Sequence, residues 1–309
     1  VRPAADGPRQ PPLLTVPGLL PYSCLVRRPF GLALALAGAL LALASPAAAA
    51  PPRRVVALAP SAAEIVYALG AAGSVVGVSD YAADLPESKG KTLLGGFVPD
   101  LERIASLSPD LAVVSRDGTD RRAAERVAAL GIRVVVTDAT SLAGVYADIR
   151  RVGDALGRGP DAERLVASLE RRTAAARERS PALRRPGRWS VLALIWPDPP
   201  VVAGPATFVG DLLEKAGLVN VVPSSAGAWP RVSHETLVAW NPRFLLKPET
   251  PENRAAFSAA FAPGTRWGLL PAVREGRVLA LPGAWLERPG PRLVDALEAL
   301  VEKLGRGEP

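Results

Sequence analysis

Two distant stretches of this chain follow one plan, LERIASLSPDLAVV at residues 101–114 and HETLVAWNPRFLL at residues 234–246. In each, a Glu stands seven residues before a Pro, and an apolar run follows the Pro. Because a Pro disfavours helical backbone at the residue before it, each stretch is predicted to be a short helix that ends near the Pro and leads into a strand. The repeated plan indicates two halves with one topology.

A second correspondence precedes each of these stretches. Residues 60–70 lead into the apolar run Val75–Val78, and residues 205–217 lead into Val219–Val222. Two similar halves predict two similar α/β lobes with a cleft between them. Ligand sites are frequent at such interfaces between domains.

The first lobe is predicted over residues 53–158, where β-rich runs alternate with helical periods. We expect its strands at residues 55–59, 75–78, 111–115 and 133–137, and helices at residues 100–107 and 120–130. Another helix is expected to begin at an N-cap formed by Ser61, with Glu64 completing a capping box. Strands that alternate with helices predict a parallel sheet covered on both faces.

A long helical period separates the two halves. It begins at Pro160, is predicted to span residues 160–181, and places Leu165 and Leu169 on one stripe. A single rigid helix there would hold the lobes at a nearly fixed spacing. The second lobe, residues 187–306, is predicted to contain strands at 190–195, 219–222, 244–247 and 277–281, and helices at 207–216, 233–240 and 293–304. The predicted fold is therefore α/β, with two Rossmann-like lobes that have parallel sheets and are joined by that helix.

The N-terminal region has the organisation of an export signal. Arg27 and Arg28 precede an apolar stretch at residues 30–44, and small residues follow Pro46. This order is typical of a cleaved signal peptide, which we assign to residues 26–49, and the apolar stretch is short for a membrane span of about 20 residues. We therefore expect a periplasmic protein. Residues 1–25 are rich in Pro, and we interpret them as a non-native extension upstream of the true start.

The chain has few side chains of the kinds that usually bind metal ions or act as catalytic bases and nucleophiles. His234 is the single histidine, and Cys24, upstream of the apolar stretch, is the single cysteine. This excludes metal sites built on several His or Cys residues and removes the usual base for a Ser nucleophile. We expect no catalytic residue, no metal and no cofactor. The formal charge is +7, but the Lys and Arg residues are scattered or lie on predicted helices, so we also expect no nucleic-acid partner.

Aromatic residues are concentrated in predicted loops that follow strands or precede helices, in both lobes. They are Tyr81, Phe97, Trp196, Trp229 and Trp285. In doubly wound sheets, ligand sites lie outside strand ends, so aromatic residues on both sides of one cleft favour a broad, flat, partly apolar ligand. For each residue alone, packing is an equally good interpretation. The tryptophans without such a placement are assigned to packing, namely Trp189, Trp240 and Trp267.

Several blocks carry a resemblance that spans about Arg53 to Leu304. They are Arg54–Val78, Val78–Tyr81, Asp100–Arg103, Asp138–Ser141, Trp229–Glu235, Trp285–Arg288 and Pro291-Arg292. In order and spacing these blocks resemble the periplasmic cobalamin-binding proteins of ABC importers, a helical-backbone class of substrate-binding protein. The Trp-Pro-x-Val-Ser-x-Glu and Trp-x-Glu-Arg blocks resemble the cobalamin branch more specifically.

The resemblance implies roles for the matching positions. The corrinoid pocket would be lined by Tyr81, Trp229, Ala284, Trp285, Leu286, Glu287 and Arg288. Glu102 and Glu235, one on each lobe, would dock into arginine pockets of a permease dimer. Each Glu also begins a short predicted helix, and for either one alone stabilisation of the helix start is the simpler interpretation. The resemblance further implies a monomer that carries cobalamin or a related corrinoid and performs no reaction.

The sequence departs from the cobalamin-binding pattern at one place, and two other functions are alternatives to cobalamin binding. Gly95-Gly96-Phe97 stands where the best-known relatives carry a Trp. Ferric siderophore and haem binding proteins share this fold, and Tyr81 could ligate iron, so such a ligand is the first alternative. A secreted α/β hydrolase is the alternative of another class, but it would need a Ser-His-acid set that His234 alone serves poorly.

Overall fold

The computed structural model describes residues 50–116, 118–184 and 189–306, and residues 50–309 form one compact unit. The segments interpreted as an upstream extension (1–25) and a signal peptide (26–49) lie outside the described residues. No described helix is both long enough and apolar enough to cross a membrane. Elements β1 to α5 are called the N-lobe below, and elements β6 to α12 the C-lobe.

The N-lobe sheet has five strands that pair in parallel in the order β3-β2-β1-β4-β5. Its strands are β1 Val55–Ala57, β2 Val75–Val78, β3 Thr92–Leu93, β4 Leu111–Ser115 and β5 Arg133–Thr137. The predicted bounds of β2, β4 and β5 are confirmed. The first strand ends two residues earlier than predicted, and β3 is not among the predicted strands.

Helices cover both faces of this sheet, as predicted. They are α2 Pro60–Ala68, α3 Leu101–Ser106, α4 Arg121–Ala129 and α5 Leu142–Ala155. Side chains alternate along β1, so Val55 packs in the cluster that holds α2 and α5, whereas Val56 packs with Ile104 of α3 and Val127 of α4. Both faces are buried, which is the reason for the continuous apolar strands of this lobe.

The predicted capping box at the start of α2 is wrong. The helix begins at Pro60, its N-cap is Ala59, and no side chain caps it. Pro is favoured in the first turn because its missing N–H would have no partner there. Ser61 and Glu64 are instead buried within the helix, and Glu64 has a different function, described below.

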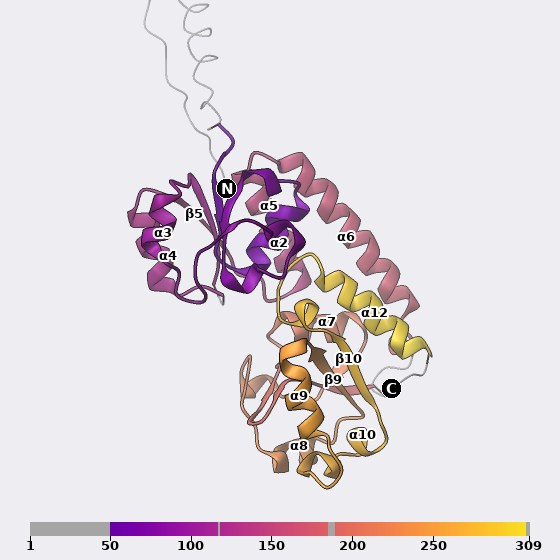
Figure 1. Cartoon of the computed structure of the whole chain (residues 1–309). Coiled ribbons are helices and arrows are strands. Elements are labelled where there is room, and N and C mark those ends of the chain that lie inside the picture. Colours follow the sequence, from indigo (N-terminus) through magenta and orange to yellow (C-terminus); the bar gives the residue numbers. More distant parts are fainter. Residues whose placement is uncertain (1–49, 117, 185–188, 307–309) are drawn as a thin grey trace, which may run out of the picture. The chain divides into compact units, whose positions relative to one another are not determined.

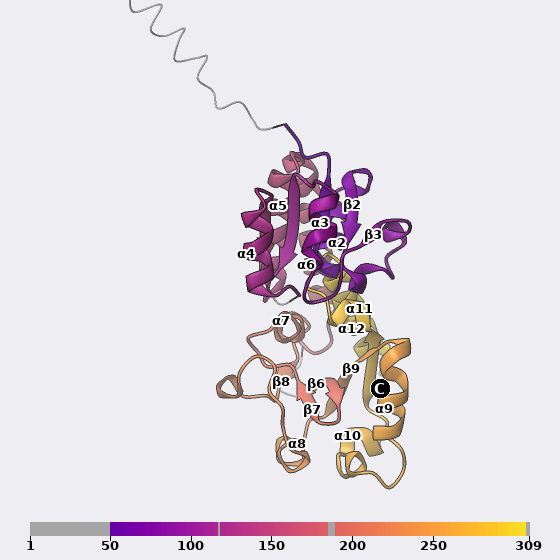
Figure 2. The ribbon, with the colours of Figure 1, turned by 60° about the vertical axis from the view of Figure 1, so that its left-hand side comes forward.

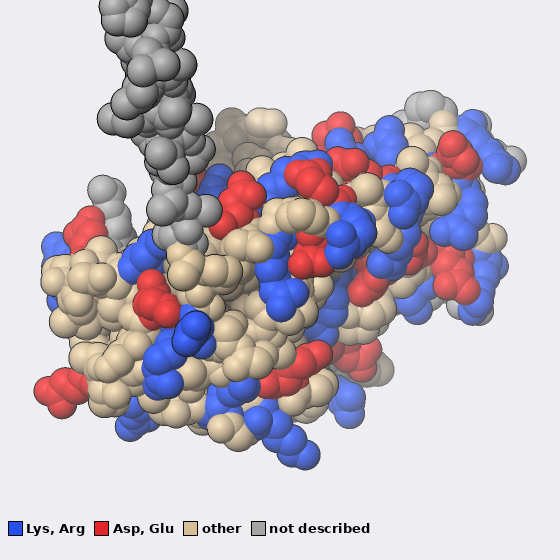
Figure 3. Space-filling view, turned by 90° about the horizontal axis from the view of Figure 1, so that it is seen from above, with Lys and Arg blue, Asp and Glu red and all other residues tan. Residues whose placement is uncertain are grey.

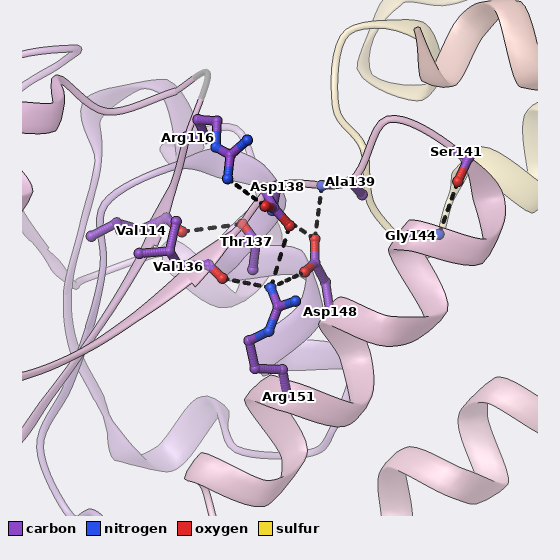
Figure 4. A network of polar contacts seen from close by, with 10 residues as sticks. All are labelled: Val114, Arg116, Val136, Thr137, Asp138, Ala139, Ser141, Gly144, Asp148 and Arg151. Atoms are coloured by element: carbon purple, nitrogen blue, oxygen red, sulfur yellow. Dashed lines mark hydrogen bonds and ion pairs between the residues drawn. The ribbon is translucent and has the colours of Figure 1, made fainter. Parts of the chain in front are cut away.

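Helix α5 was not predicted, and a buried carboxylate holds it against the end of β5 (Figure 4). Asp148 is 1% exposed and accepts the backbone N–H groups of Asp138 and Ala139, at 2.9 and 3.0 Å. Arg151 pairs with the same carboxylate at 2.6 Å and donates to the Val136 carbonyl at 2.8 Å. These contacts tie the turn after β5 to the helix that follows it.

The long helix α6, Gly159–Arg179, lies between the lobes in sequence and packs against α5 and against α12, Leu293–Arg306 (Figure 1). Arg172 of α6 donates to Asp295 and Glu298 of α12, with 2.6 Å between its Nη2 and Glu298 Oε2. The helix is thereby joined to both lobes. On the face shown in Figure 3, basic side chains are interspersed with acidic ones.

The C-lobe sheet has the order β10-β9-β6-β7, and β8 also pairs with β6. Its strands are β6 Ser190–Pro197, β7 Pro200–Val202, β8 Val219–Asn220, β9 Phe244–Glu249 and β10 Val278–Pro282. The expectation of a purely parallel sheet is wrong for β7, which runs antiparallel to β6. Only two residues connect them, and a parallel return would need a crossover of a dozen or more.

Helices cover this second sheet on both faces too. They are α7 Phe208–Lys215, α8 His234–Trp240, α9 Pro251–Ala260, α10 Pro271–Arg274, α11 Gly283–Leu286 and α12. Residues of α7 and α12 pack on one face, and α8, α9 and α10 contribute to the cluster on the other (Figure 2). Trp267 is buried and Trp189 stacks on Phe244 at 5.6 Å, which confirms their assignment to packing. Trp240 is partly buried against the same cluster as Trp267.

Candidate functional site

A large depression of about 1070 Å³, called the large cleft below, is lined by residues of both lobes. The N-lobe contributes Pro60, Asp80, Tyr81, Ala83, Asp84, Phe97 and Gly118. The C-lobe contributes Trp196, residues 249–253, residues 282–284, Glu287 and Arg288. The predicted cleft between two lobes is therefore present, and it is the most spacious of the depressions described in the structure.

A smaller depression of about 270 Å³ continues the large cleft. The two share Pro60, Gly118, Glu287 and Arg288. The further lining residues of the small depression are Ala59, Ser61, Ser115, Ile195, Phe208, Trp229, Leu286 and Pro289. The lining of this part is mostly apolar, so it would suit the hydrophobic part of a ligand.

The N-lobe wall of the large cleft is built at the carboxyl ends of strands, where ligands of open α/β sheets bind. The turn after β2 is held by Asp80, whose Oδ1 accepts the Gly95 N–H at 2.9 Å. Tyr81 follows and is 59% exposed, and its ring lies against Gly96, where an added Cβ would come within 3.0 Å of it. Phe97 is also half exposed. Gly96 therefore provides the space in which the Tyr81 ring lies.

Two tryptophans of the C-lobe present their rings to these depressions. Trp196, near the end of β6, is 42% exposed and lines the large cleft, and its indole N–H donates to the Asp198 carbonyl at 2.9 Å. Trp229 is 38% exposed and lines the small depression, with its ring tilted 59° against Phe208 at 5.6 Å. Fixed, exposed rings are suited to stacking on a flat ligand.

Not all residues of the segment Ala284–Arg288 line the cleft, although all five were expected to. Ala284, Glu287 and Arg288 line the large cleft, and the buried Leu286 reaches the small depression. Trp285 lines neither, because it packs against the main apolar core. Successive residues of a helix point about 100° apart, so the short helix α11 turns Trp285 away from the side that holds Ala284 and Glu287. The expected place of Trp285 in the pocket is therefore not supported.

Arg288 lines the large cleft and connects the two lobes. Its guanidinium donates to Glu64 at 3.4 Å, to Asp84 at 2.9 Å and to the Tyr81 carbonyl at 3.2 Å. Glu64 also accepts from Arg292 and is only 6% exposed. Sequence reasoning placed Arg288 among the ligand contacts and missed Glu64; an acidic residue inside an apolar helix was the signal that could have found it.

The carboxylates of the large cleft outnumber its cations. Asp80, Asp84, Glu249, Glu252 and Glu287 line it, against Arg288 alone. Partial burial raises the pKa of Glu287, Arg288 opposes this effect, and the nearby Glu252 charge adds to it. In the described ranges, no group of three or more His, Cys, Asp or Glu side chains could hold a metal ion.

Glu102 and Glu235 are exposed and line neither depression. Each lies in the first turn of a short helix, after an N-cap whose side chain accepts a backbone N–H: Asp100 for α3, at 3.0 Å, and Ser233 for α8, at 3.2 Å. A hydrogen bond from its own backbone N–H, and then one from the Ser233 hydroxyl, lower the pKa of Glu235. His234, beside it, lies in the first turn of α8 and packs edge-on against Trp267 at 5.1 Å.

Comparisons with known proteins give one family and consistent relatives. The family model described as periplasmic binding protein matches residues 55–284. An uncharacterized ABC transporter substrate-binding lipoprotein of Bacillus subtilis, YvrC, is 29% identical over 258 residues, covering 82% of this chain and 80% of that protein. A vitamin B12-binding protein of Pectobacterium carotovorum is 28% identical over 259 residues, covering 84% and 90%. The solved apo structure of the periplasmic haem-binding protein RhuT from Roseiflexus sp. RS-1 matches with a TM-score of 0.73 and 29% identity, covering 82% and 98%.

Proposed function

The chain belongs to the periplasmic binding protein family, and we propose that it captures cobalamin or a related corrinoid in the large cleft and delivers it to an ABC transporter permease. Members of this family are substrate-binding proteins and not enzymes, so the hydrolase alternative is rejected. Under this proposal cobalamin is cargo and not a resident cofactor. The relative named as a vitamin B12-binding protein supports this ligand class.

The observation that carries the proposal is the aromatic lining of a spacious cleft. Tyr81 and Phe97 of the N-lobe and Trp196 of the C-lobe line a depression of about 1070 Å³. A corrinoid has a broad, flat ring with amide groups at its edge. Aromatic rings from both walls would cover its faces, and backbone and side-chain polar groups of the loops would bond its amides.

The proposed ligand contacts follow from the lining residues. We assign Tyr81, Phe97, Trp196, Ala284 and Glu287 to the large cleft, and Trp229 and Leu286 to its smaller continuation. Arg288 is at the border of both, and its contacts with Glu64 and Asp84 make it a positioning residue of the cleft. Trp285 is proposed to support α11 by packing.

A haem or ferric siderophore is the second candidate ligand. The exposed Tyr81 favours it, since a phenolic oxygen can ligate iron, and so does the relative named as a haem-binding protein. The two candidates differ in how the metal is ligated. The cobalt of a corrinoid is held by the corrin ring and needs no protein ligand, whereas the iron of haem would take an axial ligand from the protein.

Delivery would use Glu102 and Glu235. Both are exposed, lie outside the cleft, and begin short helices of different lobes. A permease that presents a basic group to each could bind both lobes at once without touching the ligand. This role is consistent with export of the chain to the periplasm, which is supported by the match to the periplasmic binding protein family and by the relative named as a periplasmic haem-binding protein.

The test is a comparison of ligands on one protein. Isothermal titration calorimetry of the purified protein with cyanocobalamin, haemin and a ferric hydroxamate siderophore should give saturable one-to-one binding with cyanocobalamin. If haemin binds with a shift of its Soret band and cyanocobalamin gives no binding heat, the corrinoid proposal is wrong and haem is the ligand class. Comparing wild type with Tyr81→Phe would then show whether the phenolic oxygen ligates the iron.

A further inference from the structure

We propose that the carboxylates of the large cleft make it select ligands without peripheral negative charge, and that Glu252 and Glu287 determine this selectivity. The inference rests on the proposed corrinoid function and deepens it. The cargo would be a fully amidated corrinoid, in preference to corrinoid acids that carry free carboxylates. The site itself is defined by its size and aromatic lining, and the carboxylates add its charge preference.

The charges around the cleft leave a surplus of negative groups. Asp84 is paired with Arg288 at 2.9 Å, so that carboxylate is compensated. Glu249 lies 3.8 Å from Lys247 and 3.7 Å from Arg254, neither of which lines the cleft. Glu252 and Glu287 form no ion pair with any basic side chain among the described residues. Asp80 also forms no ion pair among the described residues, although it accepts the Gly95 N–H at 2.9 Å, so three acidic groups in the lining are without a cationic partner.

The single cation of the lining is not available to an anionic ligand. Arg288 already donates to Glu64, Asp84 and the Tyr81 carbonyl, and its side chain is only 15% exposed. A ligand carboxylate would have to displace one of these partners, leaving the nearly buried Glu64 carboxylate to Arg292 alone. Uncompensated buried charges are costly, so this exchange is disfavoured.

Glu252 and Glu287 come from different elements and act on the same space. Glu252 lies in the first turn of α9, and Glu287 follows α11. Their charges interact, because Glu252 contributes to the raised pKa of Glu287, after the larger effect of burial. A ligand carboxylate placed between them would meet like charge in a site from which the ligand excludes water. This repulsion should weaken binding by roughly tenfold for each added ligand carboxylate.

The negative charges that repel an anionic ligand would also attract the neutral amide groups at the edge of a corrinoid. An amide N–H can donate to a carboxylate, and such charge-assisted bonds are stronger than neutral ones. The corrin periphery carries many amides. Glu252 and Glu287 are therefore expected to bond amide edges and to repel the carboxylates that hydrolysis of those amides would produce.

The experiment compares cyanocobalamin with its peripheral monocarboxylate, obtained by hydrolysis of one side-chain amide, in calorimetric titrations of the purified protein. Wild type should bind the monocarboxylate roughly tenfold more weakly at low ionic strength, and the ratio should shrink in high salt. The double variant Glu252→Gln/Glu287→Gln should bring the ratio close to one. The matched control Glu302→Gln, an exposed carboxylate on α12, should keep the wild-type ratio.

The outcomes separate this inference from the proposed function. Equal affinities for the two corrinoids in wild type, or a ratio that the double variant leaves unchanged, would overturn the charge selectivity and leave corrinoid binding standing. Binding of haemin, with its propionates, more tightly than cyanocobalamin would overturn both. Melting temperatures of the variants close to wild type would show that the ratio reports on the cleft and not on folding.

Discussion

Arg288 of the C-lobe donates to Glu64 of the N-lobe across a sequence separation of 224 residues, at 3.4 Å. Glu64 is 6% exposed and also pairs with Arg292, so one buried carboxylate joins two arginines of the other lobe. Its second oxygen is buried, and an added Cβ at Gly290 would come within 2.8 Å of it. A side chain at position 290 would therefore have to displace the end of the Glu64 carboxylate.

Removing this carboxylate should destabilise the protein strongly. Glu64→Ala leaves two arginines without their shared partner, and breaking a buried ion pair typically costs about 3 kcal/mol or more. Urea unfolding monitored by circular dichroism would measure it. The exposed pair Glu302–Arg306 provides the control, since Glu302→Ala should cost less than about 1 kcal/mol. Equal effects of the two substitutions would mean that the contact between lobes is not a stabilising one.

The two tryptophans of the resemblance should behave differently when truncated. Trp229 is exposed in the small depression, so Trp229→Ala should weaken cyanocobalamin binding by about 1–3 kcal/mol and leave stability nearly unchanged. Trp285 is partly buried against the core, so Trp285→Ala should mainly lower the unfolding midpoint. Calorimetry and thermal unfolding of both variants distinguish the roles. A loss of affinity without a loss of stability in Trp285→Ala would return this residue to the pocket.

Charge reversal at the two exposed glutamates should separate docking from ligand binding. Glu102→Lys with Glu235→Lys would place like charges against basic groups of a permease, and we expect at least a tenfold weaker complex. Cyanocobalamin affinity should stay as in wild type, because neither side chain lines the cleft. The complex would be measured with permease in nanodiscs, by surface plasmon resonance. If the double variant still binds the transporter, the two glutamates only stabilise the first turns of their helices and do not dock.

The stabilisation that the contact between Arg172 of α6 and Glu298 of α12 provides should be lost at low pH. Hydrogen bonding to Arg172 holds the pKa of the Glu298 carboxyl below its usual range. A carboxyl whose pKa is lower in the folded state stabilises the fold above its unfolded pKa, and this contribution is lost as pH falls through the folded value. The difference in melting temperature between wild type and Glu298→Gln should therefore be present at neutral pH and shrink below about pH 4. A difference that grows in acid would contradict the assigned partner.

Much of the element order could be predicted because its causes are local. Apolar runs mark β2, β4 and β5 within the residues that the structure assigns to them, and the caps Asp100, Thr207 and Ser233 mark helix starts. Such signals act over a few residues, so neighbouring sequence contains them in full. The placement of exposed aromatic residues in loops after strands belongs to the same class, since a strand end and a side-chain type are both visible locally.

Two of the failures have the opposite cause. The side of α11 that meets the core depends on packing partners, and the ionic contact of Arg288 depends on Glu64 in the other lobe; these partners are far away in sequence. The antiparallel β7 is different, because only two residues separate it from β6, and the expectation of parallel strands overlooked this short connection. Composition and periodicity were sufficient for two α/β lobes, their connecting helix and the aromatic residues of a cleft. Which side chains line that cleft, and the surplus of negative charge in it, were decided only when the chain brought distant segments together, because burial and charge pairing are properties of neighbours in space.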